Sequence, residues 1–276
     1  MKSGNEILKA DMNKLTQEEL SKILTGLPVG NIYCFDSIGS TNDYGFEMAA
    51  SGAADMTIIT AFEQTKGRGR MERKWITAPG TSLPMTIIIR PKEDEMVHLN
   101  LFSPLTGLAV HEGLKRDYHI ESQIKWPNDV LLNRRKISGI LCETQWEGDR
   151  LNALILGVGI NLLHGSAPEI TDLNYPASSV EDETGMIIPS AKWIRSFVTQ
   201  ILRLRPLIGS PEFIEMWENC LAFKGETAAL VRQDGSREYC TVRGIAPDGS
   251  LLTENKNGAV QTWLAGEISL RSIQRT

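Results

Sequence analysis

The sequence has few cysteines, few histidines and no long apolar run. Its four cysteines, Cys34, Cys142, Cys220 and Cys240, lie far apart and form no CxxC pair. This spacing disfavours a disulfide framework or a zinc site and favours reduced, buried thiols in a cytosolic protein. No stretch approaches the length of a membrane span, and the N-terminal segment lacks the apolar centre of a signal peptide. We therefore expect a cytoplasmic protein that does not enter a membrane.

The chain also lacks a positive net charge. Its formal charge is −5 over 276 residues, which disfavours extensive contact with nucleic acid. Hydrophobic residues make up 41% and charged residues 23%, as in an ordinary soluble globular protein. The length permits one large domain with a sizeable core and a small second one. No internal repeat, low-complexity tract or long linker interrupts it.

A loop rich in glycine and arginine is the most unusual stretch. Residues 63–70 read EQTKGRGR and continue through Arg73 to Trp75, between two apolar, strand-like runs at 56–62 and 83–90. Glycine lets backbone N–H groups turn toward an anion, and arginine adds forked donors suited to carboxylate or phosphate oxygens. A basic loop that only faces water is the ordinary alternative. Because the chain is acidic overall, these cations are a local feature that favours a small anion.

Two helices are predicted in the first fifty residues. Thr16 to Glu19 form a capping box that opens a short helix to about residue 24, and residues 32–35 alternate as a strand. Ser40, Thr41 and Asn42 then precede a helical stretch to about residue 50. Capping explains one of these polar residues. The others would lie at a helix N-terminus, whose free N–H groups suit a polar or anionic ligand group.

The middle of the chain is dense in signals. Residues 98–118 have apolar residues at helical spacing and predict a long core helix, with Pro104 tolerated near its first turn. Residues 124–143 predict a strand, a Trp-Pro-Asn-Asp turn, a second strand, a tight turn and a returning strand. Asp129 and Lys136 are either ordinary turn residues or ligand contacts. Residues 151–162 predict an apolar strand in which Gly157 and Gly159 remove side chains where another group could approach.

The pattern changes near residue 222. Before it, residues 164–175 predict a polar loop, and 190–204 and 211–220 predict amphipathic helices. After it, short strands at 227–232, 237–245, 250–254, 258–263 and 268–273 are separated by strong turn signals. Five such strands suggest a small antiparallel barrel. We therefore predict a large domain over residues 1–221 and a small one over residues 222–276.

Six motifs together resemble the biotin protein ligase family, whose members attach biotin to carboxylases. They are GSTND at 39–43, EQTKGRGR at 63–70, KWPNDV at 125–130, RKISGIL at 135–141, GVGIN at 157–161 and GEISLR at 266–271. The resemblance extends from about residue 32 to residue 273. It implies an α+β fold: a mixed-sheet catalytic domain related to class II aminoacyl-tRNA synthetases and lipoate ligases, followed by a Src-homology-3-like barrel.

The resemblance also implies a two-step reaction. Biotin is joined to the α-phosphate of ATP as biotinyl-5'-AMP, with Mg²⁺ present, and a lysine of a biotin carboxyl carrier domain then attacks the adenylate. The carrier domain would belong to acetyl-CoA carboxylase or a related carboxylase. A lysine, with an ordinary pKa near 10.4, must lose a proton before it attacks. The resemblance assigns that assistance to Asp129, as a proton acceptor or an orienting group.

Site residues follow from the motifs that match. The resemblance implies a biotin-binding set: Ser40, Thr41, Asn42, Gln64, Gly67, Arg68, Gly69, Arg70, Lys136, Gly139 and Leu141. It implies an ATP-binding set: Arg70, Arg73, Asn128, Lys136 and Asn161. It implies a catalytic set: Arg68, Arg70, Asp129 and Lys136. No protein nucleophile and no metal-ligating side chain are predicted.

The chain departs from the family pattern at two places. Met71 and Glu72 stand where a further glycine commonly precedes Arg73, and Glu72 brings a carboxylate among cations. The loop that would cover adenine, within residues 164–175, has no tryptophan to stack on the base. Because the adenine contacts depend on that loop, the sequence leaves them open.

Three functions compete. A lipoate or octanoate ligase or transferase on the same fold is disfavoured because GRGR, KWPND and the C-terminal strands belong to the biotin pattern. A non-enzymatic, biotin-responsive regulator is disfavoured by the acidic charge and by the short segment of about thirty residues before the first family-like strand, which leaves little room for the helix-turn-helix of DNA-binding members. We expect a monofunctional ligase that does not bind DNA. Many family members dimerise through sheet edges, and the sequence leaves monomer and homodimer open.

Overall fold

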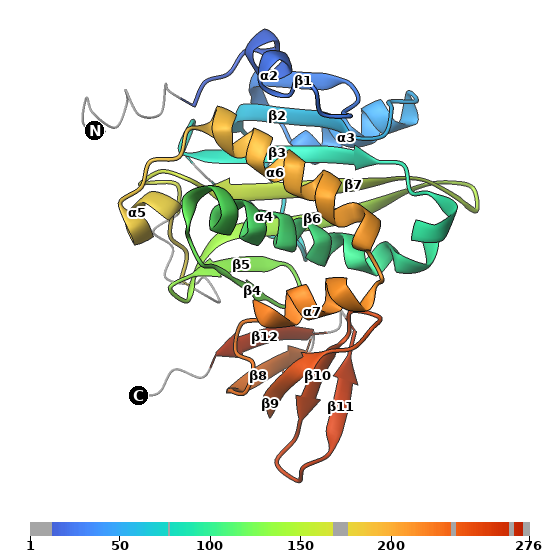
Figure 1. Cartoon of the computed structure of the whole chain (residues 1–276), viewed down its shortest axis with the longest axis vertical. Coiled ribbons are helices and arrows are strands. Elements are labelled where there is room, and N and C mark those ends of the chain that lie inside the picture. The colour runs from blue at the N-terminus through green and yellow to red at the C-terminus, as the bar shows by residue number, and fades with distance from the viewer. Residues whose placement is uncertain (1–12, 77, 168–175, 233–235, 265–267, 273–276) are drawn as a thin grey trace.

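Two β-sheets organise the chain (Figure 1). The computed structural model describes residues 13–76, 78–167, 176–232, 236–264 and 268–272. A seven-stranded sheet carries most of the core, and a five-stranded sheet lies beyond it at the C-terminal end. Residues 266 and 267 of the GEISLR motif and most of the predicted loop at 164–175 lie outside the described residues.

The large sheet is mixed, as predicted. β1 and β2 are parallel, and every other neighbouring pair is antiparallel. In spatial order its strands are β1 (Ile32–Ile38), β2 (Thr57–Gln64), β3 (Ser82–Ile89), β7 (Arg150–Asn161), β6 (Arg135–Glu147), β5 (Asp129–Leu132) and β4 (Gln123–Lys125).

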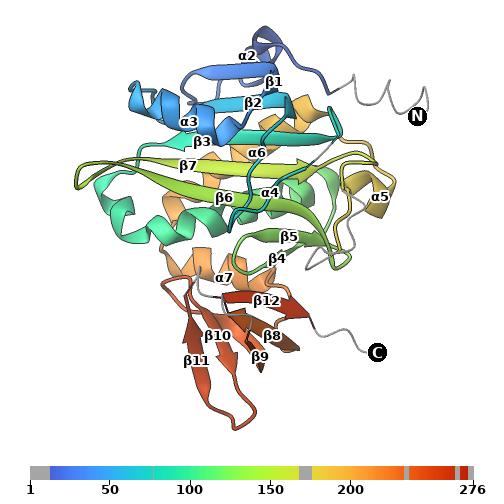
Figure 2. The ribbon, with the colours of Figure 1, turned by 180° about the vertical axis from the view of Figure 1, so that it is seen from behind.

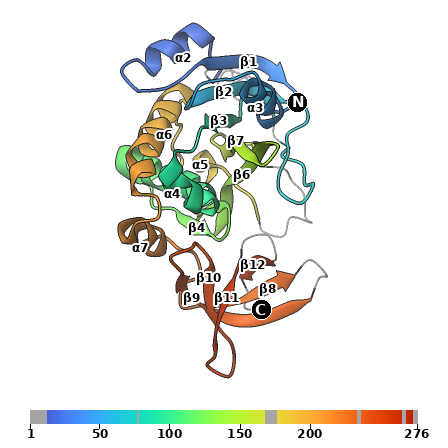
Figure 3. The same ribbon diagram turned by 90° about the vertical axis from the view of Figure 1, so that its right-hand side faces the viewer.

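Helices cover the large sheet unequally on its two faces (Figure 3). α4 (Phe102–Tyr118) and α6 (Ser190–Leu204) pack together on one face, and α3 (Thr41–Ala50) lies on the other. Figure 2 shows the loop between β2 and β3 crossing β7 and β6 on the α3 face. Every residue of β3 is buried, as is β7 from Leu151 onward except for Asn152, because both faces of these central strands are covered. The face that α3 only partly covers has room for a site.

The predicted N-caps are confirmed. Thr16 forms a complete capping box with Glu19 at the start of α2 (Gln17–Ile23). Ser40 is the N-cap of α3 and accepts a hydrogen bond from the backbone N–H of Asp43. Since Ser40 takes the capping role, Thr41 and Asn42 occupy the first turn with both side chains buried.

The long helix predicted from residue 98 begins later. α4 starts at Phe102, and η1 (Glu93–Leu101) precedes it as a 3₁₀ segment in which His98 has a non-helical φ of −119°. Apolar spacing continues through both segments, so the periodicity did not reveal the break. α5 (Val180–Thr184) was not predicted, because it is short and Val180 is its one buried residue.

Two further helical segments lie between α6 and the C-terminal strands. η2 (Arg205–Leu207) follows α6, and α7 (Pro211–Asn219) begins with Ser210 as its N-cap. The predictions of helices at 190–204 and 211–220 are confirmed. Across the described residues, no helix combines the length and apolar character needed to cross a membrane.

The C-terminal strands form one antiparallel sheet below α7 (Figure 1). The Trp126 indole N–H donates to the Gly249 carbonyl at 3.2 Å and links the two sheets. The five predicted strands are confirmed, whereas closure into a barrel and a domain boundary at residue 222 stay predictions. In spatial order they are β11 (Val260–Trp263), β10 (Leu251–Glu254), β9 (Arg237–Ile245), β8 (Thr227–Arg232) and β12 (Ile268–Ser272).

All four cysteines carry free thiols, as predicted. Cys220 and Cys240 are buried, but Cys34 and Cys142 are only half-buried, so the prediction of full burial is wrong for these two. Cys34 lies on β1, at the edge of the sheet, where less of the molecule covers it. Burial raises the pKa of Cys34 to about 11 and of Cys220 to about 12, which keeps both as thiols at neutral pH.

Candidate active site

A pocket of about 470 Å³ lies on the α3 face of the large sheet. A second cavity, of about 490 Å³, is lined by residues of α4, α7 and the β4–β6 region and contains none of the predicted site residues. The first brings together every predicted site residue except Gly67, which packs against Trp75: Ser40, Thr41, Asn42, Gln64, Arg68, Gly69, Arg70, Arg73, Asn128, Asp129, Lys136, Gly139, Leu141 and Asn161.

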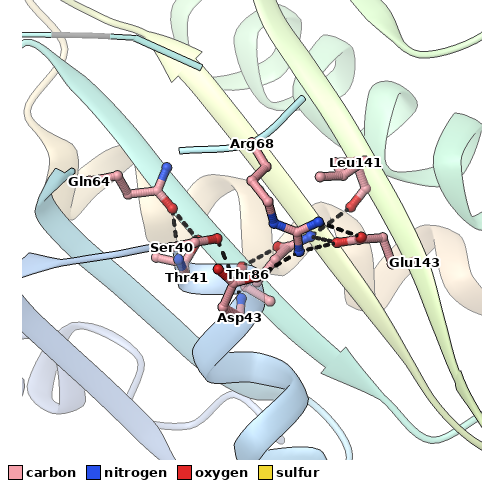
Figure 4. Close-up of polar contacts among 9 residues, drawn as sticks. Ser40, Thr41, Asp43, Gln64, Arg68, Thr86, Leu141 and Glu143 are labelled. Carbon is pink, nitrogen blue, oxygen red and sulfur yellow. Dashed lines mark hydrogen bonds and ion pairs between the residues drawn. The ribbon is translucent and has the colours of Figure 1, made fainter. Parts of the chain in front are cut away.

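The amide of Gln64 is oriented by the start of α3 (Figure 4). Its Oε1 accepts hydrogen bonds from the Thr41 backbone N–H at 2.7 Å and from Thr41 Oγ1 at 3.0 Å. Because a backbone N–H can only donate, the atom facing it must be the amide oxygen. Gln64 therefore presents its Nε2 group as the donor for a ligand.

The amide of Asn42 has the complementary orientation. Its Nδ2 donates to the Leu141 carbonyl at 3.2 Å and to Glu143 Oε2 at 2.8 Å, and its Oδ1 accepts from Thr86 Oγ1 at 2.7 Å. Both amide protons are used, so Asn42 can offer a ligand only a lone pair on Oδ1. A Cβ at Gly157 would lie 2.3 Å from that oxygen. The space that Gly157 leaves open, which the sequence suggested another group could enter, is filled by the Asn42 side chain.

Arg68 is held between two carboxylates (Figure 4). Its Nη1 and Nη2 donate to Glu143 Oε1 and Oε2 at 2.8 and 2.9 Å, and Nη2 lies 2.8 Å from Asp43 Oδ1. The hydrogen bonds that Arg68 donates to Glu143, reinforced by the charges of Glu143 and Asp43, raise the pKa of the guanidinium. Neither carboxylate was predicted to belong to the site. The sequence predicted the strand that carries Glu143 and the helix that carries Asp43, but only the tertiary fold brings both carboxylates to Arg68.

Arg70 has a different environment two residues further along the loop. Its Nη1 donates to Asn128 Oδ1 at 3.1 Å, and Asn128 Nδ2 donates to the Ile140 carbonyl at 2.8 Å. Burial lowers the pKa of Arg70, and this loss of solvation outweighs the opposing charge of Asp129. Its direct hydrogen-bond partner is neutral and it makes no ion pair among the described residues, which makes this end of the pocket attractive to an anion.

Asp129 is bound by two lysines. Lys136 Nζ lies 2.5 Å from Asp129 Oδ1 and Lys125 Nζ lies 3.0 Å from Oδ2. Burial opposes ionisation, but the two ammonium groups outweigh it and hold the pKa of the carboxyl well below its usual range. Such a carboxylate is a weak base and a strong orienting group. Lys125 was missed as a site residue, although its place opposite Asp129 across the β4–β5 hairpin follows from the KWPND spacing.

The predicted sets also omitted Trp75. A Cβ at Gly159 would lie 2.6 Å from its indole ring, and Lys136 Nζ lies 5.8 Å from a ring centroid. The indole therefore fills the space above the glycine of β7 and next to Gly139. Its buried Nε1 has no hydrogen-bond partner among the described residues. Its place directly after the glycine-arginine motif was the sequence signal.

The loop carries a tight turn at its tip. Arg73 N–H donates to the Arg70 carbonyl, Gly69 N–H donates to the Arg73 carbonyl at 2.7 Å, and Met71 and Glu72 have φ values of 55° and 58°. Two consecutive left-handed residues form a type I′ turn, which favours glycine. Both residues are exposed; Met71 lines the pocket, whereas Glu72 is not among its lining residues. Glycine would adopt this turn without strain at either position.

The side chains of the described residues do not form a resident metal site. Within the part of the chain that the structure describes, no three His, Cys, Asp or Glu side chains lie together as metal ligands. The carboxylate inside the pocket, Asp129, is already shared by two lysines. Mg²⁺ usually binds through one or two carboxylates together with substrate phosphates. This donor set fits magnesium only as the companion of a bound nucleotide.

Comparison with known proteins agrees with this geometry. Residues 34–161 match the biotin/lipoate A/B protein ligase family. The bifunctional ligase/repressor BirA of Bacillus spizizenii is 31% identical over 96% of this chain and 82% of its own length. The biotin--[acetyl-CoA-carboxylase] ligase of Paracoccus denitrificans is 29% identical over 79% of this chain and 92% of its own length.

A solved structure with bound ligands is also similar. Biotin protein ligase from Aquifex aeolicus in complex with biotin and ATP superimposes with a TM-score of 0.74 at 27% sequence identity, over 88% of this chain and 99% of that chain. The Leishmania major enzyme in complex with biotinyl-5-AMP gives a TM-score of 0.59 at 25% identity, over 85% of this chain and 99% of that chain.

Proposed function

This chain belongs to the biotin protein ligase family, and from that premise we propose that it is an ATP-dependent ligase. It converts biotin to biotinyl-5'-AMP and then transfers biotin to a lysine of a biotin carboxyl carrier domain. The observation that carries the proposal is a single pocket with two chemically distinct ends. One end pairs an oriented donor with an oriented acceptor, and the other gathers Arg70, Lys125 and Lys136.

The first end suits the ureido ring of biotin. A ureido group needs donors for its carbonyl oxygen and acceptors for its two N–H groups. Gln64 Nε2 supplies a donor and Asn42 Oδ1 an acceptor, with Thr41 beside them. Apolar lining from Met85, Val158 and the Trp75 ring suits the rest of a largely apolar ligand. Lipoate and octanoate carry no ureido ring and would leave these polar groups unpaired.

The second end suits the activation step. A biotin carboxylate oxygen forms a bond to the α-phosphorus of ATP while the bond to pyrophosphate breaks, so two anions must approach each other. We assign Arg70 and Lys136, which lie at this end beside Asn128 and Asp129, to the oxygens on which that negative charge accumulates. A well-placed donor of this kind stabilises a transition state by about 3 to 4 kcal/mol. Arg73 and Asn161 complete the predicted contacts to the nucleotide.

The transfer step needs a neutral amine next to the adenylate. The acceptor lysine attacks the acyl carbon, AMP leaves, and no covalent bond to this protein forms. We assign Asp129 to orienting the amine, because the two lysines that hold its carboxylate make it a weak proton acceptor. When Lys136 contacts substrate oxygens, Asp129 Oδ1 is released for the incoming amine.

Several parts of the proposal extend beyond the pocket. Magnesium would enter with ATP, and the partner would be the carrier domain of acetyl-CoA carboxylase or a related carboxylase. We do not extend the proposal to DNA, because the formal charge of −5 disfavours it; a gel shift with operator-like DNA tests this. A homodimer stays a prediction. The outer strands of the large sheet are β1 and β4, and β4 is already bridged to Leu221 through Ile124.

The decisive test follows both half-reactions. The protein is incubated with biotin, ATP and Mg²⁺, and mass spectrometry detects the nucleotide product; a carrier domain is then added and weighed intact. We expect biotinyl-5'-AMP first and a carrier heavier by one biotinyl group second. Lipoate and octanoate in place of biotin serve as competing substrates. Absence of the adenylate, or preference for either competing acid, would overturn the proposal.

A further inference from the structure

Glu143 lies at the centre of a hydrogen-bond network that joins the loop to the sheet (Figure 4). It is on β6, its side chain is 24% exposed, and its two oxygens receive three donors from two different elements. Two donors come from Arg68 on the glycine-arginine loop and one from Asn42 on α3. No predicted set contains Glu143, yet it contacts two predicted biotin-binding residues, Asn42 on α3 and Arg68 on the loop.

One oxygen of Glu143 is shared between these two partners. Oε2 accepts from Asn42 Nδ2 at 2.8 Å and from Arg68 Nη2 at 2.9 Å. The first contact fixes the Asn42 amide with its oxygen toward Thr86 and toward Gly157, which lines the pocket, and the second joins the loop to the sheet. Moving the Glu143 carboxylate would therefore disturb both the acceptor of the ureido end and the closed position of the loop.

Charge balance limits what Arg68 can do. One guanidinium is matched here by two carboxylates, those of Glu143 and Asp43. A substrate carboxylate would have to displace one of these charge-assisted pairs to bind Arg68 directly. Arg70 faces no such competition, since its contact is the neutral Asn128. The geometry therefore favours Arg68 as a tie between loop and sheet over Arg68 as an anion ligand.

We propose that Glu143 is a positioning residue for biotin, which acts through Asn42 and Arg68 and couples closure of the loop to recognition of the ureido ring. The inference rests on the proposed function for its substrate. Asp43 supports the same tie from the other side, but it contacts Arg68 and not Asn42, so its contribution is smaller.

Kinetics of adenylate formation test this coupling. Glu143→Gln keeps the size of the side chain and removes its charge, so we expect the biotin KM to rise about tenfold, the worth of a charge-assisted hydrogen bond, while the ATP KM changes less than about twofold. Asp43→Asn should raise the biotin KM by about two- to threefold. Glu147→Gln makes the same change at an exposed position of the same strand and should alter neither constant.

A double-mutant cycle tests the route through Arg68. If Glu143 acts through Arg68, then Glu143→Gln combined with Arg68→Met should raise the biotin KM no more than the larger single change. Fully additive losses would overturn the coupling. A rise in the ATP KM equal to that for biotin would show a general loss of structure and would also overturn it.

Amide hydrogen exchange separates this inference from the proposed function, because it needs no substrate. The Gly69 and Trp75 N–H groups donate within the loop, to the carbonyls of Arg73 and Gly67 respectively. In Glu143→Gln these two N–H groups should exchange about tenfold faster, while exchange in the central strands stays unchanged. If the unaltered protein forms no adenylate, the proposed function fails and exchange still tests the tie. If the unaltered protein forms adenylate but Glu143→Gln changes neither the exchange rates nor the biotin KM, the inference about Glu143 fails while the proposed function stands. Should Glu143→Gln not fold, Arg68→Met carries both measurements.

Discussion

The two ends of the pocket use the same residue type in opposite ways. Arg68 is paired with two carboxylates at the ureido end, whereas Arg70, two residues away on the same loop, contacts one neutral amide and is more deeply buried. The pKa of Arg68 is raised and that of Arg70 is lowered. The comparison teaches that the elements facing each arginine, and not the GRGR motif itself, decide whether it supports structure or attracts substrate.

The largest effect is expected at the cationic end, from Lys136→Met. The change removes the charge that faces the reacting oxygens and leaves Asp129 with Lys125 as its cation. Adenylate formation should fall by about 10³-fold. Pyrophosphate exchange measures it, and Lys115→Met, at an exposed position on α4, is the matched control. A loss below about tenfold would show that the cationic end does not stabilise the transition state.

Arg70→Ala tests the contrast between the two arginines directly. It removes an unpaired charge, so we expect adenylate formation to fall by about 10²-fold, with little change in the melting temperature because no ion pair is lost. Arg68→Ala should instead raise the biotin KM. Pyrophosphate exchange at several biotin concentrations separates the two effects. If both variants show the same change in kcat and KM, the two ends do not differ in role.

The two half-reactions should differ in their dependence on pH. The pKa of Asp129 lies well below its usual range, so its contribution to stability is present above the unfolded value of about 3.9 and is lost as the pH falls further. Asp129 therefore stays charged near neutrality. Adenylate formation should change less than about twofold from pH 6.5 to 8.5, whereas transfer should rise about tenfold per pH unit as the acceptor amine loses its proton. Rapid-quench assays of each step measure this, and an acidic limb in adenylate formation between these values would contradict it.

The smallest effect is expected from the glycines that admit protein side chains. Gly157→Ala would place a Cβ 2.3 Å from Asn42 Oδ1, so we expect a loss of about 1 to 3 kcal/mol in unfolding free energy together with weaker biotin binding. Gly39→Ala is the control, since no atom lies within 4 Å of its added Cβ. Chemical denaturation and calorimetry measure both. Equal behaviour of the two variants would mean that Asn42 is not held against β7.

Local signals were readable because their causes are local. A capping box, a glycine-punctuated turn or an alternating strand depends on residues close together in the chain, so α2, α3 and the C-terminal strands could be predicted from their own segments. The start of α4 could not, because apolar spacing continues through η1 and the break at His98 depends on packing. The short α5 has too few residues to show a period.

The site divides in the same way. Gln64, Asn128 and Asp129 belong to motifs of the biotin protein ligase family, so the resemblance predicted a shared site, and the pocket brings the three together. The Lys125 contact follows from a hairpin of a few residues and could have been found. The carboxylate of Glu143, which lies 75 residues from Arg68 in the chain, could not.

The sequence by itself therefore determined which residue types are present, the order of helices and strands, and the family resemblance, since each depends on neighbours in the chain. Only the tertiary structure decided how charge is shared: that Arg68 faces Glu143 and Asp43, that Asp129 lies between two lysines, and that Asn42 fills the space over Gly157. The physical reason is that electrostatic and steric partners are set by distance in space, and the turns of a mixed sheet bring distant segments within 3 Å of one another.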